Sequence, residues 1–148
     1  HCPTSNLFLG SGLINLNQLF QHGVSVGLGT DIGGGTSFSM FKTMDEAYKI
    51  QQLRGATLDP FQALYMATLG GAKALDLDTR IGSFRLNNEA DFVILDLQAT
   101  PLLKFRTPYC KSLRDLLFVL NTLGDDRVVK RTYSLGRCVH NRDGATHL

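Results

Sequence analysis

The stretch VSVGLGTDIGGG, residues 24–35, indicates the fold class of this chain. Residues 24–30 form a short apolar run with β-branched side chains, which is typical of a buried parallel strand. Asp31 and a run of glycines follow, and the spacing of apolar side chains then predicts a helix from about residue 37 to residue 54. A strand, a loop and a helix in this order make one βα unit of an α/β fold.

Predicted elements continue on both sides of this unit. Residues 1–12 indicate the end of a strand that runs into a loop, and the apolar spacing of residues 13–21 predicts a helix. Asp59 followed by Pro60 is a helix start signal, so a further helix is expected from Pro60. The patterns beyond it predict a helical turn at 72–77, strands at 81–84 and 90–97, a helix at 113–123, and a strand-turn-strand at 132–140 that turns at Leu135-Gly136-Arg137. The change of composition near residues 79 and 80 predicts a domain boundary there.

The composition excludes several classes of protein. The 15 Lys and Arg against 13 Asp and Glu give a net charge of +2, which fits neither a strongly basic nucleic-acid binder nor an acidic disordered chain. The chain has no apolar run of about 18 residues, so no membrane-spanning helix is expected. Its start has no signal-peptide pattern, and its three cysteines lie far apart. These features together predict a reducing, cytoplasmic setting.

Asp31 is the first candidate site residue. It directly follows the predicted strand, at the edge where α/β folds build their sites, and the glycines after it leave room for a ligand. The alternative is that Asp31 caps the next helix and the glycines make a tight turn. A phosphate-binding loop is not supported, because Thr36 stands where a Walker loop needs Lys and Ile32 where a dinucleotide fingerprint needs Gly.

The opening residues His1-Cys2-Pro3-Thr4-Ser5-Asn6 are the second candidate. A histidine beside a polar turn can line a site, or it can satisfy backbone groups of the loop. The four histidines are scattered, with no His-x-His pair, so local sequence assembles no multi-histidine metal site. The adjacent Asp125 and Asp126 stand next to Arg127 and are expected to order a turn.

Six segments together resemble the amidohydrolase superfamily, and within it the guanine deaminase family. The resemblance covers about residues 1–142. Its segments are HCPTSNLFLGSG (1–12), VGLGTDIGGGTSFSM (26–40), DPFQALYMATLGGAKAL (59–75), RIGSF (80–84), EADFVILDL (89–97) and TLGDDR (122–127).

The resemblance implies both a fold and a reaction. The implied fold is α/β: the last two βα units of a (β/α)8 barrel, strands 7 and 8 with their helices, over residues 1–79. The carboxyl-terminal part of a small β-rich domain with a helix follows over 80–148. The implied reaction is a zinc-dependent hydrolysis of guanine to xanthine and ammonia, by an enzyme that forms a homodimer when complete. Asp31 matches the family aspartate that contacts Zn²⁺ and moves a proton, and His1, Ser5 and Asn6 match positions at the substrate-binding rim.

The departures from the family pattern concern the metal. The family's other zinc-ligating histidines and its glutamate have no counterpart in this chain, and one carboxylate does not hold a catalytic zinc. We therefore expect the 148 residues to be a carboxyl-terminal fragment that is inactive alone. Two alternatives stay open. One is a related amidohydrolase that acts on another amino-substituted heterocycle, and the other is a non-catalytic binding or assembly module.

Overall fold

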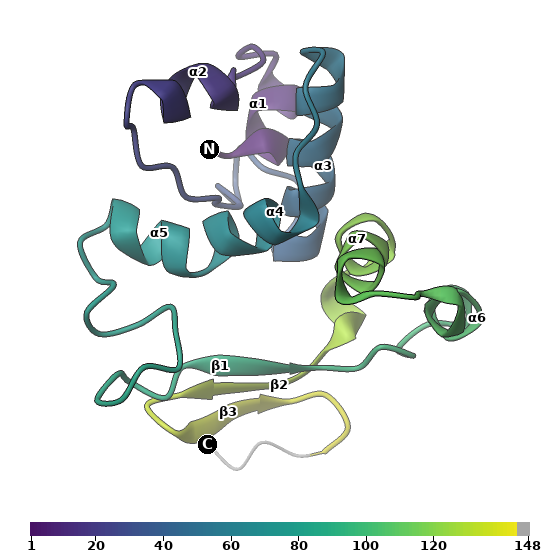
Figure 1. The fold of residues 1–148 in the computed structure, drawn as a ribbon. Coiled ribbons are helices and arrows are strands. Elements are labelled where there is room, and N and C mark those ends of the chain that lie inside the picture. The colour runs from purple at the N-terminus through teal and green to yellow at the C-terminus, as the bar shows by residue number, and fades with distance from the viewer. Residues whose placement is uncertain (145–148) are drawn as a thin grey trace.

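The computed structural model describes residues 1–144 and combines helices with one small sheet. Figure 1 shows α1 to α5 gathered in a helical part above the three-stranded sheet, with α6 and α7 to one side. The elements are α1 (Pro3–Leu9), α2 (Leu16–Gln21), α3 (Met40–Leu53), α4 (Pro60–Ala67), α5 (Leu69–Ala74), β1 (Phe92–Leu95), α6 (Pro101–Arg106), η1 (Thr107–Tyr109), α7 (Leu113–Leu123), η2 (Asp126–Val128), β2 (Val129–Ser134) and β3 (Arg137–Asn141).

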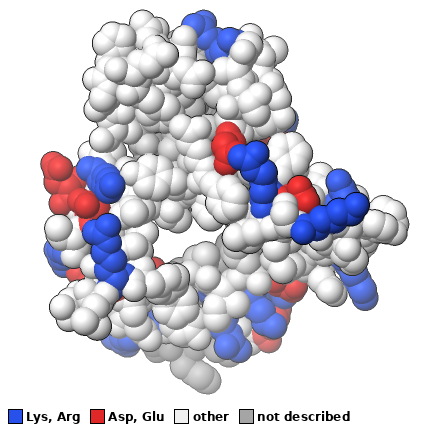
Figure 2. All heavy atoms as spheres, viewed as in Figure 1, with Lys and Arg blue, Asp and Glu red and all other residues white. Residues whose placement is uncertain are grey.

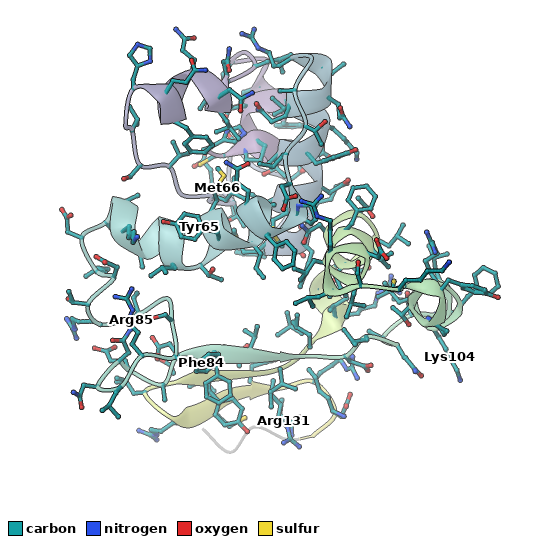
Figure 3. All side chains as sticks on the ribbon, in the orientation of Figure 1. Tyr65, Met66, Phe84, Arg85, Lys104 and Arg131 are labelled. Atoms are coloured by element: carbon teal, nitrogen blue, oxygen red, sulfur yellow. The ribbon has the colours of Figure 1, made fainter. Side chains whose placement is uncertain are left out.

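Helix α3 lies at the centre of the helical part. It packs against α1, α4 and α7, because its apolar side chains recur every three to four residues and form one face. Met66 adds to this core from α4, where it points into the helical part (Figure 3). The buried apolar cluster consists of Leu16, Phe41, Met44, Ala47, Leu58, Ala63, Met66, Leu103, Val119, Leu120 and Val128.

The sheet is antiparallel, in the order β1-β2-β3. Strands β2 and β3 are joined by Leu135 and Gly136, which both have positive φ (50° and 75°), as a two-residue type I′ hairpin turn requires. The predicted turn is therefore confirmed. Phe92 of β1 faces Tyr133 of β2 across the sheet, and their stacked rings lie 4.5 Å apart between centroids.

The helix predicted from Pro60 is confirmed, and so is its start signal. The Asp59 carboxylate accepts the N–H of Phe61 at 2.9 Å, and Pro60 occupies the first turn. The helix predicted over 113–123 forms with these bounds as α7. The helices predicted over 13–21 and 37–54 are shorter, because Asn15 and Ser39 are their N-caps.

Several predicted elements were wrong. Residues 1–12 do not run directly from a strand end into a loop, since helix α1 (Pro3–Leu9) lies between His1 and the loop. Residues 24–30 are not a β-strand of a sheet, because among the described residues only His1 forms strand-like backbone hydrogen bonds with them. Residues 81–84 form no strand either. The helical turn predicted at 72–77 begins earlier, because α5 spans Leu69–Ala74 and includes Gly70 and Gly71. Helix α6 was missed. The proposed boundary near residues 79 and 80 lies in an irregular connection and stays a prediction.

No helix among residues 1–144 is both long and apolar enough to cross a membrane. On the face drawn in Figure 2, side chains of both charge signs gather over the lower half, and the helical part above is mostly uncharged. That face therefore carries no continuous basic surface of the kind that binds a nucleic-acid backbone.

Candidate functional site

The candidate site lies where the first residues of the chain meet the run that leads to Asp31. The amino-terminal nitrogen of His1 donates a hydrogen bond to the carbonyl of Gly27 at 2.7 Å, and the Gly29 N–H donates to the His1 carbonyl at 3.0 Å. This pair of bonds brackets Leu28 in the pattern of two parallel strands. The start of α1 is thereby held beside the end of the run 24–30, within the helical part (Figure 1).

Two hydroxyl side chains of α1 face the glycine loop after Asp31. The Thr4 hydroxyl donates to the carbonyl of Thr30 at 3.1 Å, and both Thr4 and Ser5 are buried. A Cβ added to Gly35 would lie 2.9 Å from Thr4 Oγ1, and one added to Gly34 would lie 2.8 Å from Ser5 Oγ. The loop therefore passes close to α1. A Cβ at Gly35 would also collide with the loop's own backbone, whereas one at Gly34 would meet side chains alone.

Asp31 lies at the turn of this loop, with a left-handed φ of 48°. Its backbone carbonyl accepts the N–H of Gly35, and its side chain is exposed. Within residues 1–144 the Asp31 carboxylate makes no hydrogen bond or ion pair to the protein, so its oxygens are available to a ligand. The alternative that Asp31 caps the next helix was wrong, because Ser39 is the N-cap of α3.

The structure brings some of the predicted site residues together. Ser5 Oγ and Asp31 Oδ2 flank Gly34, at 2.8 and 3.3 Å from the point where its Cβ would be. The His1 backbone is hydrogen-bonded to Gly27 and Gly29, in the run that leads to Asp31. The His1 ring atom Nε2 is buried without a hydrogen-bond partner among the described residues. Asn6 is tied into α1 through its carbonyl, which accepts the N–H of Ser11 at 2.9 Å.

Thr4 is the residue that sequence reasoning missed. The interpretation of the opening segment considered His1, Ser5 and Asn6 as side chains that face a ligand. It did not consider a side chain that faces the neighbouring loop. A threonine directly after a proline at a helix start, in a chain that also holds consecutive glycines, is a weak signal for such a contact.

The described residues do not form a complete metal site. Between residues 1 and 144, no group of three or more His, Cys, Asp or Glu side chains is placed to hold a metal ion. The unpaired Asp31 carboxylate suits one ligand position, and His1 Nε2 is a buried nitrogen without a partner among the described residues. A catalytic zinc normally takes three protein ligands, so this donor set fits only part of such a site.

Asp125 and Arg127 lie outside this site and order a turn, as predicted. The Asp125 carboxylate accepts hydrogen bonds from the Arg127 guanidinium, one of them at 2.6 Å, and from the Arg127 N–H. The guanidinium holds the pKa of the Asp125 carboxyl below its usual range. The pair stabilises the start of η2.

Comparison with known proteins gives consistent results. The model of the Amidohydrolase family matches residues 1–139. The chain is 56% identical over 142 residues to the guanine deaminase of Escherichia coli, which covers 96% of this chain and 32% of the relative. It is 42% identical over 146 residues to a probable guanine deaminase of Deinococcus radiodurans, covering 97% of this chain and 33% of that protein. The chain thus spans about a third of the length of these relatives.

Solved structures agree with the sequence relatives. E. coli guanine deaminase superposes with a TM-score of 0.93, over 95% of this chain and 33% of that one. A guanine deaminase from C. acetobutylicum with bound guanine gives 0.78 at 28% identity, over 95% and 33% of the chains. An adenosine deaminase from Xanthomonas campestris with bound Zn gives 0.82 at 27% identity, over 100% and 33%. This chain belongs to the amidohydrolase family.

Proposed function

We propose that this chain is the carboxyl-terminal third of a guanine deaminase. Such an enzyme uses water to hydrolyse guanine to xanthine and ammonia. Support comes from the similarity to E. coli guanine deaminase, which spans 96% of the chain at 56% identity and extends to the backbone with a TM-score of 0.93. The unpaired Asp31 carboxylate at the glycine loop fits a hydrolytic site.

Asp31 has two roles in this proposal. Its carboxylate is one ligand of a Zn²⁺ whose remaining ligands come from outside these 148 residues. When bound, zinc makes a water nucleophilic near neutral pH. Asp31 takes the proton that the attacking water loses and returns it to the departing amine, which leaves as ammonia. The exposure of the Asp31 side chain and its lack of a described partner support both roles.

His1, Ser5 and Asn6 form the rim of this site in our proposal. The short approach of Ser5 to the Asp31 loop and the unpartnered His1 Nε2 support a position beside the purine. The parallel bonds of His1 around Leu28 support the placement of residues 1–79 in two adjacent βα units of a (β/α)8 barrel. Residues 80–148 then form part of a small β-rich domain.

A chimera tests the function. The part of E. coli guanine deaminase that matches this chain is replaced by residues 1–148, and xanthine formation is measured with zinc, alongside adenosine as a competing substrate. We expect the chimera to convert guanine, and Asp31→Asn to lower the rate by about 100-fold or more at unchanged thermal unfolding. The isolated 148 residues are expected to be inactive and to bind no catalytic zinc.

Three results contradict parts of this proposal. A folded, zinc-loaded chimera that converts adenosine and leaves guanine untouched favours the alternative of a related amidohydrolase. A folded chimera without either activity favours the non-catalytic module. Turnover of guanine by the isolated chain in excess zinc shows that the remaining ligands are not needed.

A further inference from the structure

Thr4 contacts the backbone next to Asp31. Its hydroxyl donates to the carbonyl of Thr30, the residue directly before Asp31, and the two residues lie 26 positions apart in the chain. Thr4 is only 3% exposed, so its hydroxyl is largely shielded from water. A hydrogen bond in such surroundings constrains the position of both partners more strongly than an exposed one.

The same hydroxyl also limits the far side of the loop. Gly35 passes Thr4 Oγ1 closely, and its N–H donates to the Asp31 carbonyl, which closes the loop on itself. Ile32 and Gly35 form a bridge within this loop. Thr4 therefore touches the segment both before and after Asp31, and Asp31 itself is held in a left-handed conformation that non-glycine residues rarely adopt.

We propose that Thr4 is a positioning residue that holds the Asp31 backbone so that the exposed carboxylate stays open to a ligand beside Gly34. Thr4 does this through its hydroxyl and not through its methyl group, since the hydroxyl makes the bond to Thr30. The role rests on the proposed function of Asp31 as a zinc ligand and proton carrier. Ser5, the next residue, faces Gly34 and not the Thr30 carbonyl, so it does not replace Thr4.

The test compares variants in the chimera described above. Thr4→Val removes the hydroxyl and keeps the shape, whereas Thr4→Ser keeps the hydroxyl. Thr43→Val is the matched control, because Thr43 is also buried and its hydroxyl also donates to a backbone carbonyl, that of Ser39 at 3.2 Å within α3. The readouts are kcat and KM for guanine, the rate of zinc loss to a chelator, and the thermal unfolding midpoint.

Loss of an outer residue that orients a metal ligand typically lowers metal affinity or activity by about 10–100-fold. We expect Thr4→Val to lower kcat in this range with KM changed less than about twofold, and to release zinc at least about fivefold faster. Thr4→Ser should restore both values to within about threefold of the parent, and Thr43→Val should leave both unchanged.

Three outcomes overturn the positioning role. These are a Thr4→Val chimera with parental kcat and zinc release, a Thr4→Ser variant as impaired as Thr4→Val, and a Thr43→Val variant with the same losses. The zinc-release measurement separates this role from the proposed function. If the chimera binds zinc and does not deaminate guanine, the proposed function fails, while the comparison of zinc release among the three variants still decides on Thr4.

Discussion

The close contacts of the glycine loop after Asp31 predict how much stability an alanine at each glycine would cost. Alanine at Gly35 would place its Cβ against the backbone carbonyl oxygen of Thr30 and 2.9 Å from Thr4 Oγ1. Backbone atoms cannot turn aside, so the loop itself must shift. Overpacking of this kind costs about 1–3 kcal/mol, and breaking the Thr4–Thr30 hydrogen bond adds about 0.5–1.5 kcal/mol. We expect Gly35→Ala to lower the free energy of unfolding by about 3 kcal/mol.

Two neighbouring glycines provide the comparison. Alanine at Gly34 would meet the side-chain atoms Ser5 Oγ, Leu9 Cδ1 and Asp31 Oδ2 at 2.8, 3.2 and 3.3 Å, and these can move by rotation. Its expected loss is about 1 kcal/mol, the size of a strained rotamer. Alanine at Gly29 would meet only Cys2 Sγ within 4 Å, at an ordinary contact distance of 3.5 Å. We expect its effect to stay within about 0.5 kcal/mol.

Denaturant unfolding of the three chimera variants checks the order Gly35→Ala, then Gly34→Ala, then Gly29→Ala. The unfolding slope should stay constant, so that the midpoints report stability. A loss below about 1 kcal/mol for Gly35→Ala, or a larger loss for Gly34→Ala, would refute the geometry of the loop and with it the close approach of Thr4.

Two further predictions concern the rest of the chain. Leu103 of α6 is fully buried, so Leu103→Ala should lower the free energy of unfolding by about 2–5 kcal/mol; a loss below about 1 kcal/mol would remove α6 from the core. The Arg142 guanidinium, 2.8 Å from Asp96, and the Gln98 N–H hold the pKa of the Asp96 carboxyl below its usual range. Because the folded pKa lies below the unfolded one, Asp96 stabilises the fold above about pH 4 and this contribution is lost as the pH falls through the folded pKa. Unfolding midpoints between about pH 7 and pH 3 should therefore fall less steeply in Arg142→Leu than in the parent, and equal slopes would contradict the pairing.

Local start signals in the sequence predicted helices well where they were recognised. Asp59 and Pro60 fixed the beginning of α4 because a capping carboxylate and a proline act within one helical turn. The same signal stands at Thr100 and Pro101, where the Thr100 hydroxyl accepts the N–H of Leu103, and it was overlooked because α6 is short. Pro3 likewise begins α1 although its surroundings are typical of a loop.

Strands were less predictable, because a strand depends on a partner that the local pattern does not contain. Residues 24–30 have the composition of a buried parallel strand, and in the described chain they pair only at His1 and contact α4 through the bond from the Leu28 N–H to the Met66 carbonyl. The candidate site was predictable only where its residues depend on local sequence. Asp31 could be identified because it directly follows the apolar run 24–30. Thr4 could not, because its contact with Thr30 joins residues 26 positions apart.

The packing of α7 has a consequence for how the molecule opens. Its residues Val119 and Leu120 share one buried cluster with Phe41 and Met44 of α3, and the Asn121 side chain donates to the carbonyl of Pro60 at the start of α4. Detaching any one of these helices exposes apolar surface on the other two, so partial opening is about as unfavourable as opening all three. The backbone amides of α3, α4 and α7 should therefore exchange their hydrogens with solvent as one slow group.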